Sequence, residues 1–182
     1  ASKVFIPLTV GGGVSKLKDI ERLLESGADK VSINTSAILD PSLVSSAAKK
    51  FGSQCIVVAV DSKRDGEKSY VYTHGGKNKT AFETSAWIKI VENEGAGEIL
   101  LTSMDRDGTK IGFDNELTSS ITKDLTIPLI TSGGAGTIDH MVEGITDGKA
   151  DAVLAASIFH QKEITITEVK KGLASKGIEV RL

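Results

Sequence analysis

One carboxylate of this chain stands where proton transfer can occur. Asp61 ends the apolar run 57–60 and is followed by Lys63 and Arg64. A carboxylate at the end of a buried strand is partly removed from water, which tunes it for general acid or base catalysis. A loop aspartate that pairs with Lys63 or Arg64 is the alternative, and the sequence pattern leaves both roles open.

Two glycine-rich turns are the second feature with chemical meaning. Residues 9–14 read TVGGGV and residues 131–136 read TSGGAG, and a further pair of similar segments begins at Ala28 and Ala150. Both pairs are separated by 122 positions, from 9 to 131 and from 28 to 150. Two matches at one offset indicate that the chain is built from two related halves.

Each half ends one apolar run in glycines and the next in small polar residues. Backbone N–H groups in such turns bind anions, phosphate among them. The residues expected to do so are Gly12, Gly13, Asn34 and Thr35 in the first half, and Gly133, Gly134, Ala156 and Ser157 in the second. Although glycine often serves only a tight turn, two symmetric sets predict a ligand with two phosphates.

Three further charged features have plainer interpretations. The segment 104–109 (MDRDGT) reads as a solvated turn at Asp107-Gly108. Lys30 and Glu98 precede apolar runs, so both are expected at strand starts, where surface ion pairs are the default.

The elements that position these residues follow from the hydrophobic pattern. Strands are expected at residues 4–10, 31–34, 55–61, 98–103, 127–131 and 152–156, and a β-hairpin within residues 62–81. Helices are expected at residues 15–26, 41–51, 84–94, 115–122, 137–146 and 163–176. Ser15 is expected to cap the first helix and Gly27 to end it. Strands that are apolar on consecutive positions are typical of parallel sheets covered by helices on both faces.

The expected fold is therefore an α/β fold, an incomplete TIM (βα)8 barrel in one domain of residues 1–182. Six βα units are visible, whereas the closed barrel has eight. The first two units match the last two, and the middle pair has no match in this chain. The six units are therefore interpreted as strands 3–8 of the full barrel.

Composition excludes several classes of function. The hydrophobic share is 40%, charged residues are 25%, and the net charge of −2 does not favour nucleic acid or an anionic membrane as a partner. No apolar run has the length of a membrane span.

Cys55, the only cysteine, is expected in a buried strand rather than as a nucleophile, and a reducing cytoplasm fits. His74, His140 and His160 lack metal-ligand spacing, so neither a metal nor a cofactor is expected.

Together these segments resemble the cyclase subunit of imidazole glycerol phosphate synthase, a barrel of histidine biosynthesis. The likeness covers the whole chain, although a related isomerase of the preceding step shares the phosphate turns. The segments that carry it are residues 8–13 (LTVGGG), 27–35 (GADKVSINT), 58–64 (VAVDSKR), 95–109 (GAGEILLTSMDRDGT), 132–136 (SGGAG) and 155–160 (AASIFH). The run 105–110 (DRDGTK) and the ending 177–181 (GIEVR) look more like the cyclase.

The resemblance implies a function and a role for each matching residue. The cyclase takes a bisphosphorylated small molecule, N′-[(5′-phosphoribulosyl)formimino]-5-aminoimidazole-4-carboxamide ribonucleotide. With ammonia it gives imidazole glycerol phosphate and aminoimidazole carboxamide ribotide. Asp61 matches the second of two catalytic aspartates. Thr102 and Ser132 match polar residues at the barrel mouth, and Asp107 and Gly108 match the loop near one phosphate.

The resemblance also implies a partner at the opposite face. Ammonia comes from a glutamine amidotransferase subunit that docks on the bottom of the barrel. Lys30 and Glu98 match the charged residues at that entrance, and Asp29 matches a glutaminase contact. This reverses the plain interpretation of Lys30 and Glu98 as a surface pair.

The chain also departs from the family pattern. The first two βα units, with the first catalytic aspartate, have no counterpart here, so we expect little or no cyclase activity from this chain alone. The alternatives are a non-catalytic, self-associating barrel fragment that retains phosphate binding and the related isomerase. Open strand edges are prone to pairing, so a homo-oligomer is expected, most simply a two-fold dimer.

Overall fold

The computed structural model describes residues 5–181. The chain forms two compact units, residues 1–100 (unit 1) and residues 101–182 (unit 2). Within the described residues, none of the helices combines the length and the apolar character that crossing a membrane requires.

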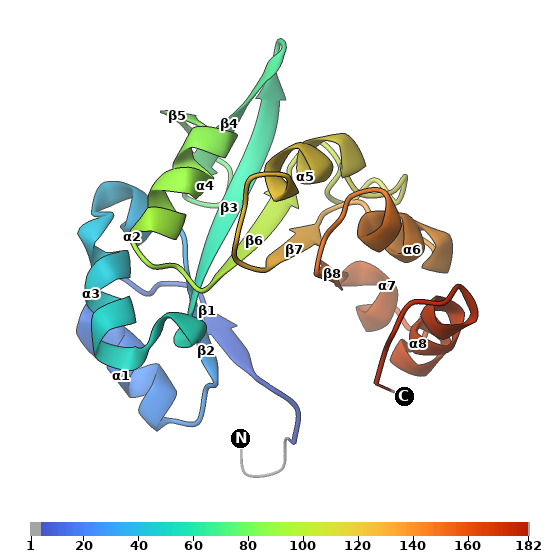
Figure 1. Ribbon diagram of the computed structural model, residues 1–182, viewed down its shortest axis with the longest axis horizontal. Helices are drawn as coiled ribbons and strands as arrows, with labels where there is room; N and C mark the ends of the chain where they lie inside the picture. The colour runs from blue at the N-terminus through green and yellow to red at the C-terminus, as the bar shows by residue number, and fades with distance from the viewer. Residues whose placement is uncertain (1–4, 182) are drawn as a thin grey trace. The chain divides into compact units, whose positions relative to one another are not determined.

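Unit 1 consists of parallel strands joined by helices (Figure 1). Its elements are β1 (Thr9–Gly11), α1 (Leu17–Glu25), β2 (Lys30–Ile33), α2 (Thr35–Leu39), α3 (Ser42–Phe51), η1 (Ser53–Cys55), β3 (Ile56–Asp65), β4 (Lys68–Thr73), β5 (Asn78–Glu83) and α4 (Thr84–Asn93). The strands β1, β2 and β3 pair in parallel, with Val10 opposite Val31 and Ile33 opposite Val58. Consecutive βα units therefore contribute neighbouring strands.

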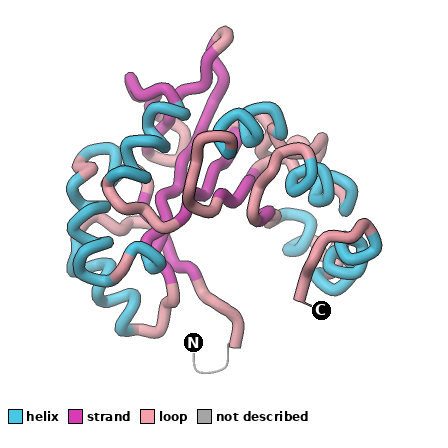
Figure 2. The backbone as a smooth tube through the Cα atoms, viewed as in Figure 1, coloured by secondary structure: helices cyan, strands magenta, loops and turns pink. Residues whose placement is uncertain are grey.

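A β-hairpin extends β3 beyond the parallel part of the sheet, as the pattern of residues 62–81 predicts. From Asp61 onward β3 pairs antiparallel with β4, and β4 pairs antiparallel with β5. In Figure 2 the tips of β3 and β4 extend past the helices of this unit. Lys79 donates to the Asp65 carboxylate and lies 3.9 Å from the centre of the Tyr70 ring. The hydrogen bond from Lys79 lowers the pKa of the Asp65 carboxyl below its ordinary value.

The core of unit 1 lies between its strands and helices. Ile20 of α1 and Val44 of α3 are fully buried, as are Val31 of β2 and Ile56 and Val58 of β3. Burial of such side chains is the main favourable contribution to folding. It also fixes the positions at which the strands end.

Unit 2 repeats the same arrangement at the other end of the chain. β6 (Glu98–Ser103) leads into it, followed by α5 (Asn115–Thr122), β7 (Leu129–Ser132), α6 (Ile138–Thr146), β8 (Ala152–Leu154), α7 (Ser157–His160) and α8 (Ile166–Ser175). β7 and β8 pair in parallel, with Thr131 opposite Val153. Its core cluster contains Phe113, Met141, Ile158, Val169 and Leu173.

The strand order confirms the predicted fold class. It is β1-β2-β3-β6-β7-β8, with β4 and β5 attached to β3. The chain therefore has an α/β fold with six parallel strands, an incomplete TIM (βα)8 barrel. The prediction of a single domain stays a prediction.

Several local predictions are corrected. The first strand is expected from residue 4, which lies outside the described residues, but β1 starts only at Thr9, where its pairing with β2 begins opposite Lys30. Cys55 belongs to the 3-10 turn η1 and is half-buried, not a residue of a buried strand. The cap of α1 is at Lys16, where the Asp19 carboxylate accepts the Lys16 N–H and the hydroxyl of Ser15. Gly27, with a φ of +98°, follows the helix end as predicted.

The two halves share equivalent hydrogen bonds, which supports the internal repeat, but the offset between matching residues is not uniform. Leu8 donates its N–H to Asp29 Oδ2 at 2.7 Å and its carbonyl accepts the Asp29 N–H at 2.9 Å. Leu129 and Asp151 make the same two bonds, at 2.9 and 3.0 Å. Leu8 therefore corresponds to Leu129, an offset of 121 rather than 122. The corresponding turn residues are Gly12 with Gly133 and Gly13 with Gly134, all at positive φ.

Candidate functional site

Asp61 and Asn34 are in direct contact in unit 1. Asn34 follows the last residue of β2, and Asp61 lies just beyond Val58, the last β3 residue paired with β2. The Asn34 Nδ2 donates to Asp61 Oδ2 at 2.9 Å, and both residues are half-buried. The parallel pairing of β2 and β3 thus brings together a predicted catalytic carboxylate and a predicted phosphate-turn residue.

The side chain of Asn34 does not cap the helix that follows it. Asparagine is a favoured helix N-cap, and Asn34 occupies that position of α2, but its side chain makes no capping bond. Its Oδ1 is buried without a hydrogen-bond partner among the described residues. Because buried polar atoms are almost always paired, this unpaired acceptor indicates that the local geometry is set by the bond to Asp61.

The hairpin holds the start of α2 through Thr35. The Thr35 hydroxyl accepts the backbone N–H of His74 at 3.1 Å, and His74 Nδ1 lies 3.0 Å from Thr73 Oγ1. His74 has a φ of +54°, so this residue sits in a tight turn. Thr35 therefore links the polar end of β2 to the inserted hairpin.

The glycine turn of unit 1 faces open space. Gly12 and Gly13 have φ values of +97° and +70°, and a Cβ on either would have no described atom within 4 Å. Packing against neighbouring atoms therefore does not require these two glycines, whereas their positive φ values favour glycine. The open space beside their backbone leaves room for a ligand.

Lys30 and Glu98 form an ion pair at the amino ends of their strands. Lys30 Nζ lies 2.7 Å from Glu98 Oε2, and the two side chains are 33% and 14% exposed. Asp29, the residue before Lys30, accepts the Leu8 N–H and so holds the start of β1 against β2. These three residues lie at the opposite strand ends from Asp61.

In unit 2 most of the predicted phosphate residues line one cavity of about 150 Å³. The cavity lies at the carboxyl ends of β7 and β8. The predicted residues that line it are Asp107, Gly108, Ser132, Gly133, Gly134, Ala156 and Ser157. Thr102, a half-buried residue of β6, is not part of its lining. Lys110 also lines it and was not singled out by the sequence pattern.

Close packing requires glycine at both positions of the second turn, Gly133 and Gly134. A Cβ on Gly133 would lie 2.6 Å from the Ser103 carbonyl oxygen, and one on Gly134 would lie 2.2 Å from that of Gly112. The Gly136 N–H donates to His140 Nδ1 at 3.1 Å, so a side chain of α6 also fixes the turn. The two glycine turns therefore differ: this one is packed from behind, and the turn of unit 1 is open.

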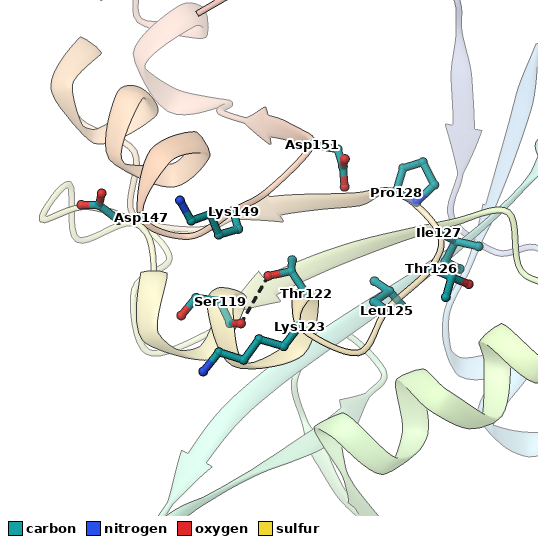
Figure 3. Close-up of a pocket in the computed structure, with 10 residues that line it drawn as sticks. All are labelled: Ser119, Thr122, Lys123, Leu125, Thr126, Ile127, Pro128, Asp147, Lys149 and Asp151. Carbon is teal, nitrogen blue, oxygen red and sulfur yellow. Dashed lines mark hydrogen bonds between the residues drawn. The ribbon is translucent and has the colours of Figure 1, made fainter.

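A larger cavity of unit 2, about 520 Å³, lies at the opposite strand ends (Figure 3). Its walls come from the end of α5, the loop before β7 and the loop between α6 and β8. Lys123, Asp147, Lys149 and Asp151 bring charge to it, and all four are exposed. Because this hollow is lined by exposed charged side chains, we place anion binding in unit 2 in the smaller cavity, where the polar residues are brought together.

The chemistry of these sites is that of proton transfer and anion binding. Among residues 5–181, no group of three or more His, Cys, Asp or Glu side chains is placed to hold a metal ion. Unit 1 offers a carboxylate fixed by an amide donor, and unit 2 offers a small cavity lined by backbone and hydroxyl groups. Sequence reasoning found both from strand ends, but it missed Lys110 and His140, because neither follows a strand directly.

The chain matches a model of a known protein family. Residues 1–165 match the family described as histidine biosynthesis protein. The match covers most of the 182 residues and includes both glycine turns, Asp61 and the cavity of unit 2.

Proposed function

The chain belongs to the histidine biosynthesis protein family, and we propose that it is the cyclase subunit of imidazole glycerol phosphate synthase. In this role it converts the phosphoribulosyl-formimino aminoimidazole carboxamide ribotide, with ammonia, to imidazole glycerol phosphate and aminoimidazole carboxamide ribotide. The family match supports an enzyme of histidine biosynthesis. The assignment to the cyclase step is our proposal.

Asp61 is the proposed proton-transfer group of this chain. The Asn34 amide donates to its Oδ2, and this bond restricts the rotation of the carboxyl group. A carboxylate held in this way can accept a proton from a nitrogen of the substrate during ring closure and return it to the leaving group.

The two glycine turns are the proposed phosphate sites. The turn of unit 2, with Asp107, Gly108, Ser132 and Ser157, takes one phosphate in the 150 Å³ cavity. The turn of unit 1, with the open Gly12 and Gly13, takes the other. A bisphosphorylated substrate therefore suits the residues of both halves.

The observation that favours the cyclase over the related isomerase is the Lys30–Glu98 ion pair. It is partly buried and lies at the amino ends of the strands, away from Asp61. A cyclase that takes ammonia from a glutaminase would use a charged entrance at that face, and Lys30 and Glu98 match the charged residues that the resemblance places there. We therefore also propose that Asp29, Lys30 and Glu98 face a glutamine amidotransferase subunit.

A product assay tests this proposal. The purified chain is given the bisphosphorylated substrate and an ammonium salt at alkaline pH, with and without a polypeptide that carries the first two βα units of a family member. We expect imidazole glycerol phosphate, detected by mass spectrometry, in the supplemented reaction. Asp61→Asn is expected to lower its rate by at least about a hundredfold, as for other general acids and bases.

Three other outcomes separate the alternatives. In a parallel reaction supplied with the ribosyl form of the compound, conversion to the ribulosyl form without formation of imidazole glycerol phosphate would assign the chain to the isomerase step. Binding of phosphate without either reaction would leave a non-catalytic binding protein. An Asp61→Asn protein as active as the unchanged chain would remove Asp61 from the mechanism.

A further inference from the structure

An ion pair connects Lys110 of the unit 2 cavity with Glu163, a residue outside the cavity lining. Lys110 Nζ lies 2.5 Å from Glu163 Oε1, and the side chains are 41% and 38% exposed. Lys110 is in the loop after β6, which also carries Asp107 and Gly108 of the cavity lining. Glu163 follows α7, and its N–H donates to the carbonyl of Ile158, the neighbour of Ser157 in the other wall.

The charges of the lining make Lys110 the group of interest. Among the described residues that line the cavity, Asp107 carries the only negative charge and Lys110 the only positive one. A phosphate monoester brings a charge of about −1.5 to −2 at neutral pH. A cation favours its binding next to Asp107, and Lys110 is the cation that the lining provides.

The backbone of Lys110 is fixed beside the glycine turn. Its φ is +58°, a left-handed conformation that costs a residue with a Cβ free energy. A Cβ on Gly136 would lie 2.6 Å from the Lys110 carbonyl oxygen, so the lysine backbone is packed against the glycine turn. The backbone is therefore fixed at the cavity, whereas the partly exposed side chain can still rotate.

We propose that Lys110 exchanges partners when phosphate binds. In the empty cavity its ammonium is held by Glu163, and in the occupied cavity it turns to the phosphate. Glu163 is then a competitor for the cation and lowers the affinity of the site for phosphate monoesters. This inference rests on the proposed phosphate site of unit 2 and names the residue that provides its charge and the residue that regulates it.

Calorimetric titration of the full chain with inorganic phosphate and with glycerol 1-phosphate tests the exchange. Lys110→Met removes the charge but keeps the aliphatic stem, and it is expected to weaken binding about tenfold, the effect of one charge-assisted hydrogen bond. Glu163→Gln frees the lysine and is expected to tighten binding up to about fivefold, the strength of an exposed ion pair.

The double variant Lys110→Met/Glu163→Gln distinguishes exchange from a general effect of charge. If Glu163 acts through Lys110, the double variant binds as weakly as Lys110→Met alone. Glu163→Gln can also tighten binding without Lys110, by the same factor in the Lys110→Met background as in the unchanged chain. In that case Glu163 acts only through the electrostatic repulsion between its carboxylate and the phosphate, and the proposed exchange is wrong. Lys162→Met, an exposed lysine outside the lining, is the matched control and is expected to leave affinity unchanged.

The remaining outcomes separate this inference from the proposed function. Binding by the unchanged chain with no effect of Lys110→Met or Glu163→Gln would keep the phosphate site and overturn the exchange. Binding that is detectable only after Glu163→Gln would support the exchange in its strongest form. Absence of binding in the unchanged chain and in Glu163→Gln would overturn both.

Discussion

At the scale of single residues, the bond from Asn34 to Asp61 is the interaction with the most direct consequence for chemistry. Its length of 2.9 Å is that of a well-formed N–H···O hydrogen bond, and both residues are half-buried. We expect Asn34→Ala to destabilise the protein by about 1–2 kcal/mol. In an Asp61→Asn background the same change is expected to cost less, with a coupling of about 1 kcal/mol between the two positions. Urea unfolding of the four proteins in this cycle measures the coupling.

The control for this cycle is Asn93→Ala, since Asn93 is an exposed residue at the end of α4. It is expected to change stability by no more than about 0.5 kcal/mol. Zero coupling between positions 34 and 61 would show that the bond does not order the carboxylate. The proposed role of Asn34 in positioning would then be lost.

Sequence reasoning could locate these residues but not their partners. Asp61 and Asn34 both follow apolar runs, and the ends of parallel strands meet at one edge of a sheet. The pattern therefore predicts that they are near one another. It assigns Asn34 to an anion, however, because the direction of its side chain depends on the register of β2 against β3, which a hydrophobic pattern does not contain.

At the scale of elements, the start of α8 shows how a side chain fixes a boundary. The Glu168 carboxylate accepts the Thr165 hydroxyl and N–H at 2.7 and 2.8 Å, and the Thr165 hydroxyl accepts the Glu168 N–H at 3.2 Å. This reciprocal arrangement is a capping box. The hydrogen bonds from Thr165 hold the pKa of the Glu168 carboxyl below its ordinary value of 4.5.

A pH dependence of stability follows from this lowered pKa. Because the folded state favours the ionised form, the contribution of Glu168 is fully present above the unfolded pKa and is lost as the pH falls through the folded one. We expect Glu168→Gln to lower the urea midpoint by a constant amount from about pH 7 to pH 5.5, and by less at lower pH. Unfolding curves from pH 2.5 to pH 7 measure it. A difference that grows on acidification would contradict the assigned role.

The same scale shows where boundaries can be predicted. The ranges of β6 and α5 are predicted to the residue, because turn signals and a clear apolar run border each of them. The short helices α2 and α7 are not predicted, since each follows a strand within one or two residues and lacks a full amphipathic period. The uniform offset of 122 was wrong. Leu8 and Asp29 are 21 positions apart in the first half, whereas Leu129 and Asp151 are 22 positions apart in the second.

At the scale of the whole molecule, fold class was predictable because it depends on many weak signals that agree. Six apolar runs, each followed by a helical pattern, leave few arrangements other than parallel βα units. The division into two compact units near Leu100 was not predicted. It depends on how many contacts cross a given point of the chain, and no local pattern reports that.

The outer strands lead to the last prediction, which concerns association. Among the described residues β1 pairs only with β2, and β8 pairs only with β7. Large apolar side chains are exposed next to these edges: Phe5 is 94% exposed and Ile6 is 61% exposed before β1, and Leu154 of β8 is 37% exposed. Unpaired strand edges with apolar neighbours favour pairing with another chain. We therefore propose that two copies associate through these edges.

Light scattering coupled to size-exclusion chromatography at about 1–100 μM measures this association, and we expect twice the mass of one chain. Phe5→Lys/Ile6→Lys places charges beside the β1 edge, where they disfavour pairing, and is expected to shift the protein toward the mass of one chain. Leu39→Lys replaces an apolar residue of α2 that is 75% exposed and lies outside both edges, so it should leave the mass unchanged. If Leu39→Lys alone dissociates the dimer, the contact lies on the helices. If the unchanged chain stays at the mass of one chain throughout, these edges do not recruit a second copy.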